Sequence, residues 1–182
     1  MRVRELKEEF PWTTEQTGKR STGKPHVTGL IRMMEVGIQE TSGKELSDAT
    51  RMQFEKGWLW EATLSMAFGE KSAHRPGEIE LDGIVGSPDG LTVNSNKSKY
   101  FDVVEEYKCT AYSPDKPITE HFRWMAQVKA YCKMVGATKC VFRVLHLSFV
   151  PVYKVWELVF SQRELDENWE ALVNQAKVMK GE

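Results

Sequence analysis

The hydrophobic pattern in the first third of the chain has a helical period. Apolar residues at helical spacing predict a helix over 28–36, with Thr28 at its start and a glycine directly after its end. A longer helix is predicted to end at about Phe68, and Ser47 and Asp48 are suitable residues to cap its beginning.

The period then changes to that of β-strands. Residues 78–85 and 91–93 predict two strands joined by a turn, Gly-Ser-Pro-Asp-Gly over 86–90, because proline and glycine at these positions favour a reversal. After a polar loop, a third strand is predicted over 100–110.

The second half of the chain contains both periods. A helix is predicted over 118–135 with Gly136 at its end, then strands over 139–147 and 152–160, and a last helix over 163–179. The expected apolar stripe of the first of these helices consists of Ile118, Phe122, Met125, Cys132 and Val135. This order predicts an α/β fold with a mixed central β-sheet flanked by helices.

Length and composition fit one globular domain. Of the 182 residues, 41% are hydrophobic and 28% are charged. We expect a single domain over 1–182, with a partly flexible N-terminal appendage over 1–46, a core over about 47–160 and a C-terminal helix over about 163–179. The chain has neither a membrane-length apolar run nor a signal-peptide pattern. We therefore expect no membrane partner and a cytoplasmic location, in the host cell if the protein is phage-encoded.

Cysteine count and charge narrow the possible functions. Three cysteines without a C-x-x-C pair argue against a disulfide framework and against a self-contained zinc site. The net charge of −1 indicates no overall preference for nucleic acid, but residues 97–154 carry ten basic and five acidic side chains. This local positive excess suits a phosphate backbone.

Two acidic residues and a lysine are candidates for an active site. Glu106 and Lys108 lie two positions apart on the third strand and therefore on one face, and Asp89 lies in the preceding turn. Converging carboxylates bind a hard cation such as Mg²⁺ or Mn²⁺, which promotes phosphodiester hydrolysis while Lys108 holds or deprotonates the attacking water. Taken singly, E-x-K on a strand is more often a solvated ion pair, and P-D-G is more often an ordinary turn.

The same residues resemble a known signature. Pro88-Asp89 followed by Glu106-Tyr107-Lys108 resembles the PD-(D/E)xK nucleases, and the wider patterns G-S-P-D-G-L and E-Y-K-C are similar to the YqaJ-like viral recombinases and lambda-type phage exonucleases. The resemblance implies a restriction-endonuclease-like core and a DNA nuclease that uses Mg²⁺ or Mn²⁺. It also implies that Asp89 and Glu106 ligate the metal, with the backbone carbonyl of Tyr107 as a further ligand.

Two more motifs of these families are present. Gly57 and Glu61 form a G-x-x-x-E on the long helix, where the glycine permits close backbone approach and the resemblance makes Glu61 another metal ligand. Gln127 and Tyr131 share a face of the helix that follows the third strand. By resemblance, Gln127 supports catalysis by orienting the water, Lys108 or the scissile phosphate.

DNA is the expected partner, and the candidate contacts to nucleic acid are Trp12, Lys19, Arg20, Lys24, Arg123 and Tyr131. The resemblance implies a phage-type exonuclease that acts in recombination or DNA end processing, and an endonuclease of the same superfamily is an alternative that the sequence leaves open. The sequence also leaves open a homo-oligomer and a single-strand-annealing recombination partner. A non-catalytic DNA-binding or recombination accessory protein on the same fold is the alternative from another functional class.

Overall fold

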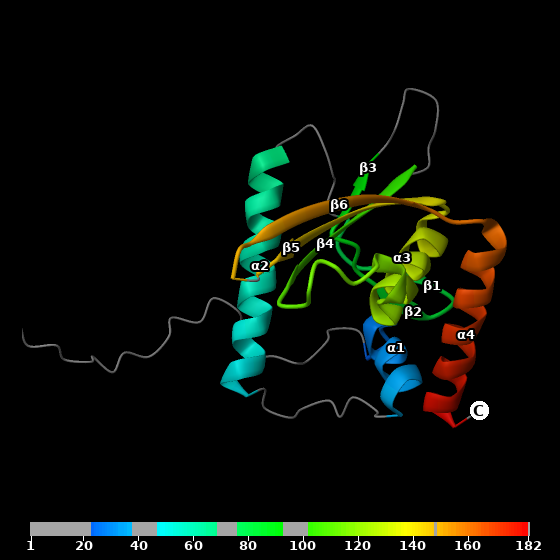
Figure 1. Cartoon of the computed structure of the whole chain (residues 1–182). Coiled ribbons are helices and arrows are strands. Elements are labelled where there is room, and N and C mark those ends of the chain that lie inside the picture. The colour runs from blue at the N-terminus through cyan, green and yellow to red at the C-terminus, as the bar shows by residue number, and fades with distance from the viewer. Residues whose placement is uncertain (1–22, 38–46, 69–75, 93–101, 148, 182) are drawn as a thin grey trace, which may run out of the picture.

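The computed structural model describes residues 23–37, 47–68, 76–92, 102–147 and 149–181. Its elements, shown in Figure 1, are α1 (Val27–Val36), α2 (Asp48–Phe68), β1 (Ile79–Leu81), β2 (Ile84–Gly86), β3 (Gly90–Thr92), β4 (Val103–Thr110), a 3₁₀ turn η2 (Ile118–Glu120), α3 (Phe122–Val135), β5 (Lys139–His146), β6 (Val152–Val159) and α4 (Gln162–Lys180).

The central sheet is mixed, as predicted. Its strand order is β3-β4-β5-β6, in which β4 and β5 run parallel and the two outer pairs run antiparallel. Val104, Phe142 and Val144 are fully buried and belong to the same core as side chains of α1, α3 and α4. Figure 1 shows these three helices grouped below the sheet, whereas α2 stands apart from them and contacts β4.

The predicted strand over 78–85 is wrong, because a tight turn divides it. β1 and β2 pair antiparallel as a separate hairpin, and Asp82 and Gly83 between them have φ values of 50° and 75°. Two successive left-handed residues form the type of turn that matches the twist of a hairpin, and Asp-Gly is one of its preferred sequences. The hairpin leaves β2 directly before the turn that carries Asp89.

α1 belongs to the core, which corrects the prediction that residues 1–46 form an appendage. Val27, Leu30 and Ile31 are at most 2% exposed and pack in the central cluster. The helix begins one residue earlier than predicted, because the His26 side chain accepts a hydrogen bond from the Thr28 N–H and serves as the cap. The remainder of the predicted appendage, residues 1–22 and 38–46, lies outside the described residues.

The helix predicted over 118–135 is interrupted near its beginning. A 3₁₀ turn ends before His121, whose backbone (φ −89°, ψ 81°) is not helical, and α3 begins at the next residue. The predicted apolar stripe is also partly wrong, because Phe122 is 48% exposed. The buried face of α3 instead consists of Ala126, Val128, Ala130, Tyr131 and Cys132.

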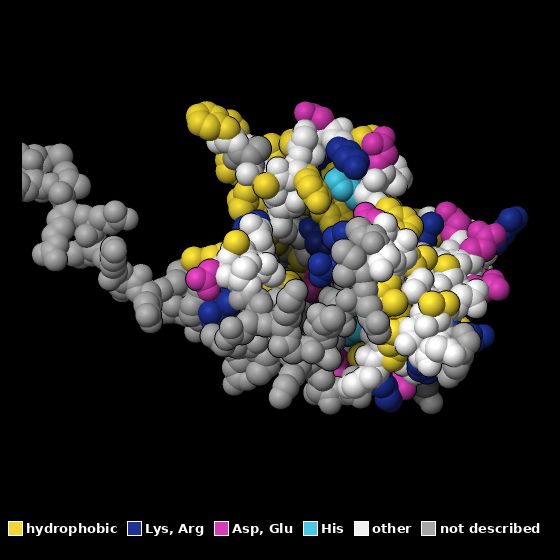
Figure 2. Space-filling view, turned by 90° about the horizontal axis from the view of Figure 1, so that it is seen from below, with side chains coloured by type: hydrophobic (Ala, Val, Ile, Leu, Met, Phe, Trp, Pro, Cys, Tyr) yellow, Lys and Arg dark blue, Asp and Glu magenta, His cyan; other side chains and the backbone are white. Residues whose placement is uncertain are grey.

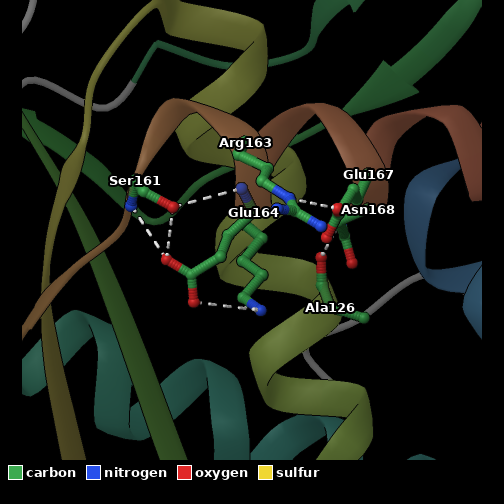
Figure 3. A network of polar contacts seen from close by, with 7 residues as sticks. Ala126, Ser161, Arg163, Glu164, Glu167 and Asn168 are labelled. Carbon is green, nitrogen blue, oxygen red and sulfur yellow. Dashed lines mark hydrogen bonds and ion pairs between the residues drawn. The ribbon is translucent and has the colours of Figure 1, made fainter.

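α4 is fixed against α3 by polar contacts at its first turns, shown in Figure 3. Ser161 and Glu164 form a capping box, in which each side chain accepts a hydrogen bond from the backbone N–H of the other. Glu164 also lies 3.9 Å from Lys129 of α3, and the Asn168 amide donates to the Ala126 carbonyl at 3.1 Å. The predicted last helix is thereby confirmed.

Charged and hydrophobic side chains are interspersed over the described part of the lower face. Figure 2 shows basic side chains near the middle of this face, with hydrophobic ones to either side. In the described segments, no helix has the length and apolar character needed to cross a membrane. Cys109, Cys132 and Cys140 are free thiols, as predicted.

Candidate active site

The turn after β2 brings Asp89 beside the middle of β4. β3 pairs with β4 at Gly90 and Glu105, so the antiparallel register places Asp89 opposite Glu106, one step further along. The Asp89 carboxylate accepts a hydrogen bond from the Tyr107 N–H at 2.7 Å. The bend and the strand that carries Glu106 and Lys108 therefore lie side by side, as the sequence predicts.

Glu106 is a buried carboxylate with two donors of different charge. Its side chain is 1% exposed, whereas that of Lys108 is 24% exposed. The Lys108 ammonium forms an ion pair with Oε1 of Glu106, and the Gln127 amide donates to the same oxygen at 2.8 Å. A carboxylate is costly to bury unless such partners offset the loss of water. The predicted link between Gln127 and the E-x-K strand is therefore present.

Tyr131 supports this site from the core. Its ring is 1% exposed, and the Gln127 amide donates to its hydroxyl at 3.1 Å. Burial raises the pKa of Tyr131, and the negative charges of Glu106 and Asp89 add to the effect. The Tyr131 hydroxyl therefore interacts electrostatically with both carboxylates. The prediction that Tyr131 contacts nucleic acid is wrong, because a fully buried ring presents no face to a strand.

Gly86 makes room for the Tyr131 ring. A Cβ at this position would lie 2.8 Å from Cε1 of Tyr131 and 2.8 Å from Sδ of Met134, both closer than van der Waals contact allows. The methionine could move, since its side chain is flexible. The tyrosine ring is enclosed and contacts Gln127, so packing favours glycine at the last position of β2.

The neighbouring Glu105 has a different environment, which the sequence analysis did not identify. Its carboxylate pairs with Arg143 at 2.7 Å and accepts hydrogen bonds from the Tyr107 and Thr92 hydroxyls at 2.7 and 2.8 Å. These contacts neutralise it on the opposite face of β4 from Glu106. Strand alternation would have separated the two glutamates, but no sequence signal linked Arg143 to either.

The G-x-x-x-E motif is only partly described. Glu61 lies on α2, but its side chain is outside the described residues, so its role as a metal ligand stays a prediction. The expected close backbone approach at Gly57 is wrong, because a Cβ there would meet nothing within 4 Å. Arg51 and Glu55 of the same helix are 8% and 3% exposed, and their burial was not predicted.

Two of the predicted contacts to nucleic acid form ion pairs. Arg123 pairs with Glu35 of α1, and Lys24 pairs with Glu80 of β1. The positive excess over 97–154 is reduced in the same way, since α3 lysines pair with acidic residues of α4. Three of the predicted contacts, Trp12, Lys19 and Arg20, lie outside the described residues.

The donors at this site suit a hard cation. Asp89 and Glu106 supply carboxylate oxygens, the ligands that Mg²⁺ and Mn²⁺ prefer. The N–H and C=O of one strand residue point to the same side, so the Tyr107 carbonyl faces the side on which its N–H meets Asp89. Within the described residues, no group of three His, Cys, Asp or Glu side chains is placed to hold a metal.

An open pocket lies beside Lys108. Its volume is about 290 Å³. It is lined by Gln53 and Lys56 of α2, by the end of β4 and the residues after it, and by Trp124 of α3. Lys108, which pairs with Glu106, therefore borders the same space as a second lysine, Lys56.

No family model and no curated protein matches the chain, but solved structures do. An alkaline exonuclease from Laribacter hongkongensis is 17% identical and has a TM-score of 0.53, over 85% of this chain and 78% of that one. The same enzyme in complex with dAMP is 16% identical and has a TM-score of 0.54, over 86% of this chain and 89% of that one. A phage-related exonuclease from Haemophilus somnus 129PT is 12% identical and has a TM-score of 0.52, over 82% of this chain and 77% of that one.

The chain has the fold of these exonucleases. The predicted α/β core with a mixed central sheet, and the resemblance to PD-(D/E)xK exonucleases on which that prediction partly rested, are thereby confirmed at the level of fold. An exonuclease fold does not by itself determine chemistry, which depends on the side chains at the site.

Proposed function

We propose that the protein is a Mg²⁺- or Mn²⁺-dependent deoxyribonuclease, an exonuclease of the phage type that acts in recombination or DNA end processing. One observation carries the proposal. The hydrogen bond between Asp89 and the Tyr107 N–H joins the P-D turn to the E-x-K strand opposite the buried Glu106, whose partner Lys108 lines an open pocket.

Asp89 and Glu106 would hold the metal, together with the Tyr107 carbonyl and, by resemblance, Glu61. When bound, such an ion polarises a phosphate oxygen and lowers the pKa of a bound water, the chemistry needed to hydrolyse a phosphodiester. The carboxylates are pre-oriented, since the Tyr107 N–H fixes one and Gln127 fixes the other.

Lys108 would act on the water or on the phosphate. Lys108 lines the pocket and is 24% exposed, while its ammonium pairs with the buried Glu106. From there it can donate to a water or stabilise negative charge on the phosphate. Gln127 would act as a positioning residue, because it holds Glu106 and is itself held against Tyr131.

The mode of cleavage is tested by comparing linear and circular DNA. End-labelled linear duplex and covalently closed circles are incubated with the protein and Mg²⁺, Mn²⁺ or EDTA. We expect metal-dependent loss of the linear label while circles persist. Nicked circles would instead identify an endonuclease, and no cleavage of either would identify the non-catalytic alternative.

Asp89→Asn is the matched control for this assay. The amide oxygen of asparagine can still accept the Tyr107 N–H, but the side chain no longer carries charge for a cation. We expect a folded protein without metal-dependent cleavage. Self-association and a single-strand-annealing partner stay predictions.

A further inference from the structure

A cluster of aromatic rings lies beside the proposed active site. Tyr112 follows β4, and His121 and Trp124 lie at the beginning of α3. The His121 and Trp124 rings have centroids 4.0 Å apart and an interplanar angle of 18°, and the Tyr112 centroid lies 5.5 Å from that of His121 and 6.0 Å from that of Trp124. The Trp124 centroid lies 5.6 Å from that of the buried Phe142, so the three rings form a cluster that adjoins the core.

The Tyr112 ring is exposed, although its backbone is fixed. Tyr112 is 60% exposed. Its N–H donates to the Thr110 hydroxyl at 3.1 Å, and its carbonyl accepts from Nδ1 of the buried His146 at 2.9 Å. An exposed ring on a fixed backbone contacts a ligand with little further loss of conformational freedom.

The cluster and the lysines border the same space. Tyr112 and Trp124 line the pocket together with Lys56 and Lys108. Burial lowers the pKa of His121, and the charge of Lys116 adds to the effect, which favours the neutral imidazole. Flat neutral rings beside ammonium groups form the combination that binds a nucleotide, because the rings stack on a base and the cations attract its phosphate.

We propose that this pocket binds one nucleotide of a DNA strand, with its base stacked on Tyr112 and its phosphate directed toward Lys56 and Lys108. The inference rests on the proposed nuclease function and names a subsite next to the cut. Every base has a π-face, so the subsite accepts all four bases. A stacked base must be out of its duplex, so the pocket takes a single-stranded or frayed end.

The test is a binding measurement that needs no cleavage. The affinity for a fluorescent single-stranded oligonucleotide of about eight nucleotides is measured by anisotropy in EDTA. Tyr112→Leu should weaken binding roughly 5- to 150-fold, the range for loss of one base–aromatic stack, whereas Tyr112→Phe should stay within about twofold. Tyr153→Leu is the matched control, since Tyr153 of β6 is 46% exposed but packs edge-to-face on Trp60 of α2.

Oligonucleotides with one abasic site separate stacking from a structural role. At one position near the end, removing the base should weaken binding to the wild type and abolish the difference between wild type and Tyr112→Leu. If Tyr112→Leu weakens binding equally for every abasic position, the ring only supports the fold. Unchanged affinity in a folded Tyr112→Leu variant would also overturn the subsite. Either result can occur in a protein that cleaves DNA, whereas absence of both binding and cleavage in the wild type would reject the proposed function itself.

Discussion

Removal of the Lys108 ammonium should destabilise the metal-free protein through Glu106. The Glu106 side chain is 1% exposed, and Lys108→Ala removes its charged partner while the Gln127 amide still donates to Oε1. A further change, Glu106→Gln, keeps the shape of the side chain but removes its charge. In that background the lysine has no carboxylate to neutralise, so its removal should cost much less.

The magnitude follows from the burial of the two partners. A hydrogen bond to a charged group contributes about 1.5–3 kcal/mol, and breaking a fully buried ion pair costs about 3–5 kcal/mol. Lys108 is 24% exposed, so water replaces part of its interaction and the lower end applies. We expect Lys108→Ala to lower the free energy of unfolding by about 1–3 kcal/mol, and by under about 1 kcal/mol when Glu106 is already glutamine.

Urea denaturation in EDTA of the wild type, both single variants and the double variant measures this coupling. We predict a coupling energy of about 1–2 kcal/mol, together with loss of cleavage by at least about 100-fold in Lys108→Ala. Additive effects within about 0.5 kcal/mol would refute the reasoning, because they would mean that the ammonium does not stabilise the buried carboxylate.

Three further predictions concern packing, capping and metal. Gly86→Ala should displace the Tyr131 ring and cost about 1–3 kcal/mol in urea denaturation, while a cost under about 0.5 kcal/mol would show that the ring moves freely. Ser161→Ala should cost about 1 kcal/mol at pH 7. Alanine keeps the backbone N–H bond that lowers the pKa of Glu164 but loses the hydroxyl bond that lowers it further, so part of this difference should shrink as the pH falls below the unfolded value near 4.5. A constant difference would mean that the hydroxyl does not stabilise the carboxylate. Mn²⁺ at about 100 times its Kd should stabilise the wild type by about 2.7 kcal/mol but not Asp89→Asn, and equal stabilisation of both would place the ion elsewhere.

The predicted elements that agree with the structure are those with a strong period and clear ends. β5 and β6 alternate regularly, and α4 has a serine cap and a glycine end. Two predicted elements were wrong because a local backbone conformation interrupts a regular hydrophobic pattern. The Asp82-Gly83 turn divided an apparently continuous strand, and the non-helical backbone at His121 interrupted a helical pattern.

The candidate site could be predicted as far as its members share short motifs. Asp89, Glu106 and Gln127 lie on three elements in the order that the resemblance implies, and the structure brings them together. The partnership of Glu105 with Arg143 depends on which residues become neighbours across a parallel pair of strands. The aromatic cluster likewise depends on how a loop meets a helix, which hydrophobic periodicity does not encode.

A crystal structure with Mn²⁺, with anomalous scattering used to locate the ion, tests the central claim most directly. We predict a peak about 2.0–2.3 Å from a carboxylate oxygen of Asp89 and from one of Glu106, and no such peak in Asp89→Asn. Cleavage-competent protein with no peak between these two carboxylates, or with its ion bound elsewhere, would contradict the account.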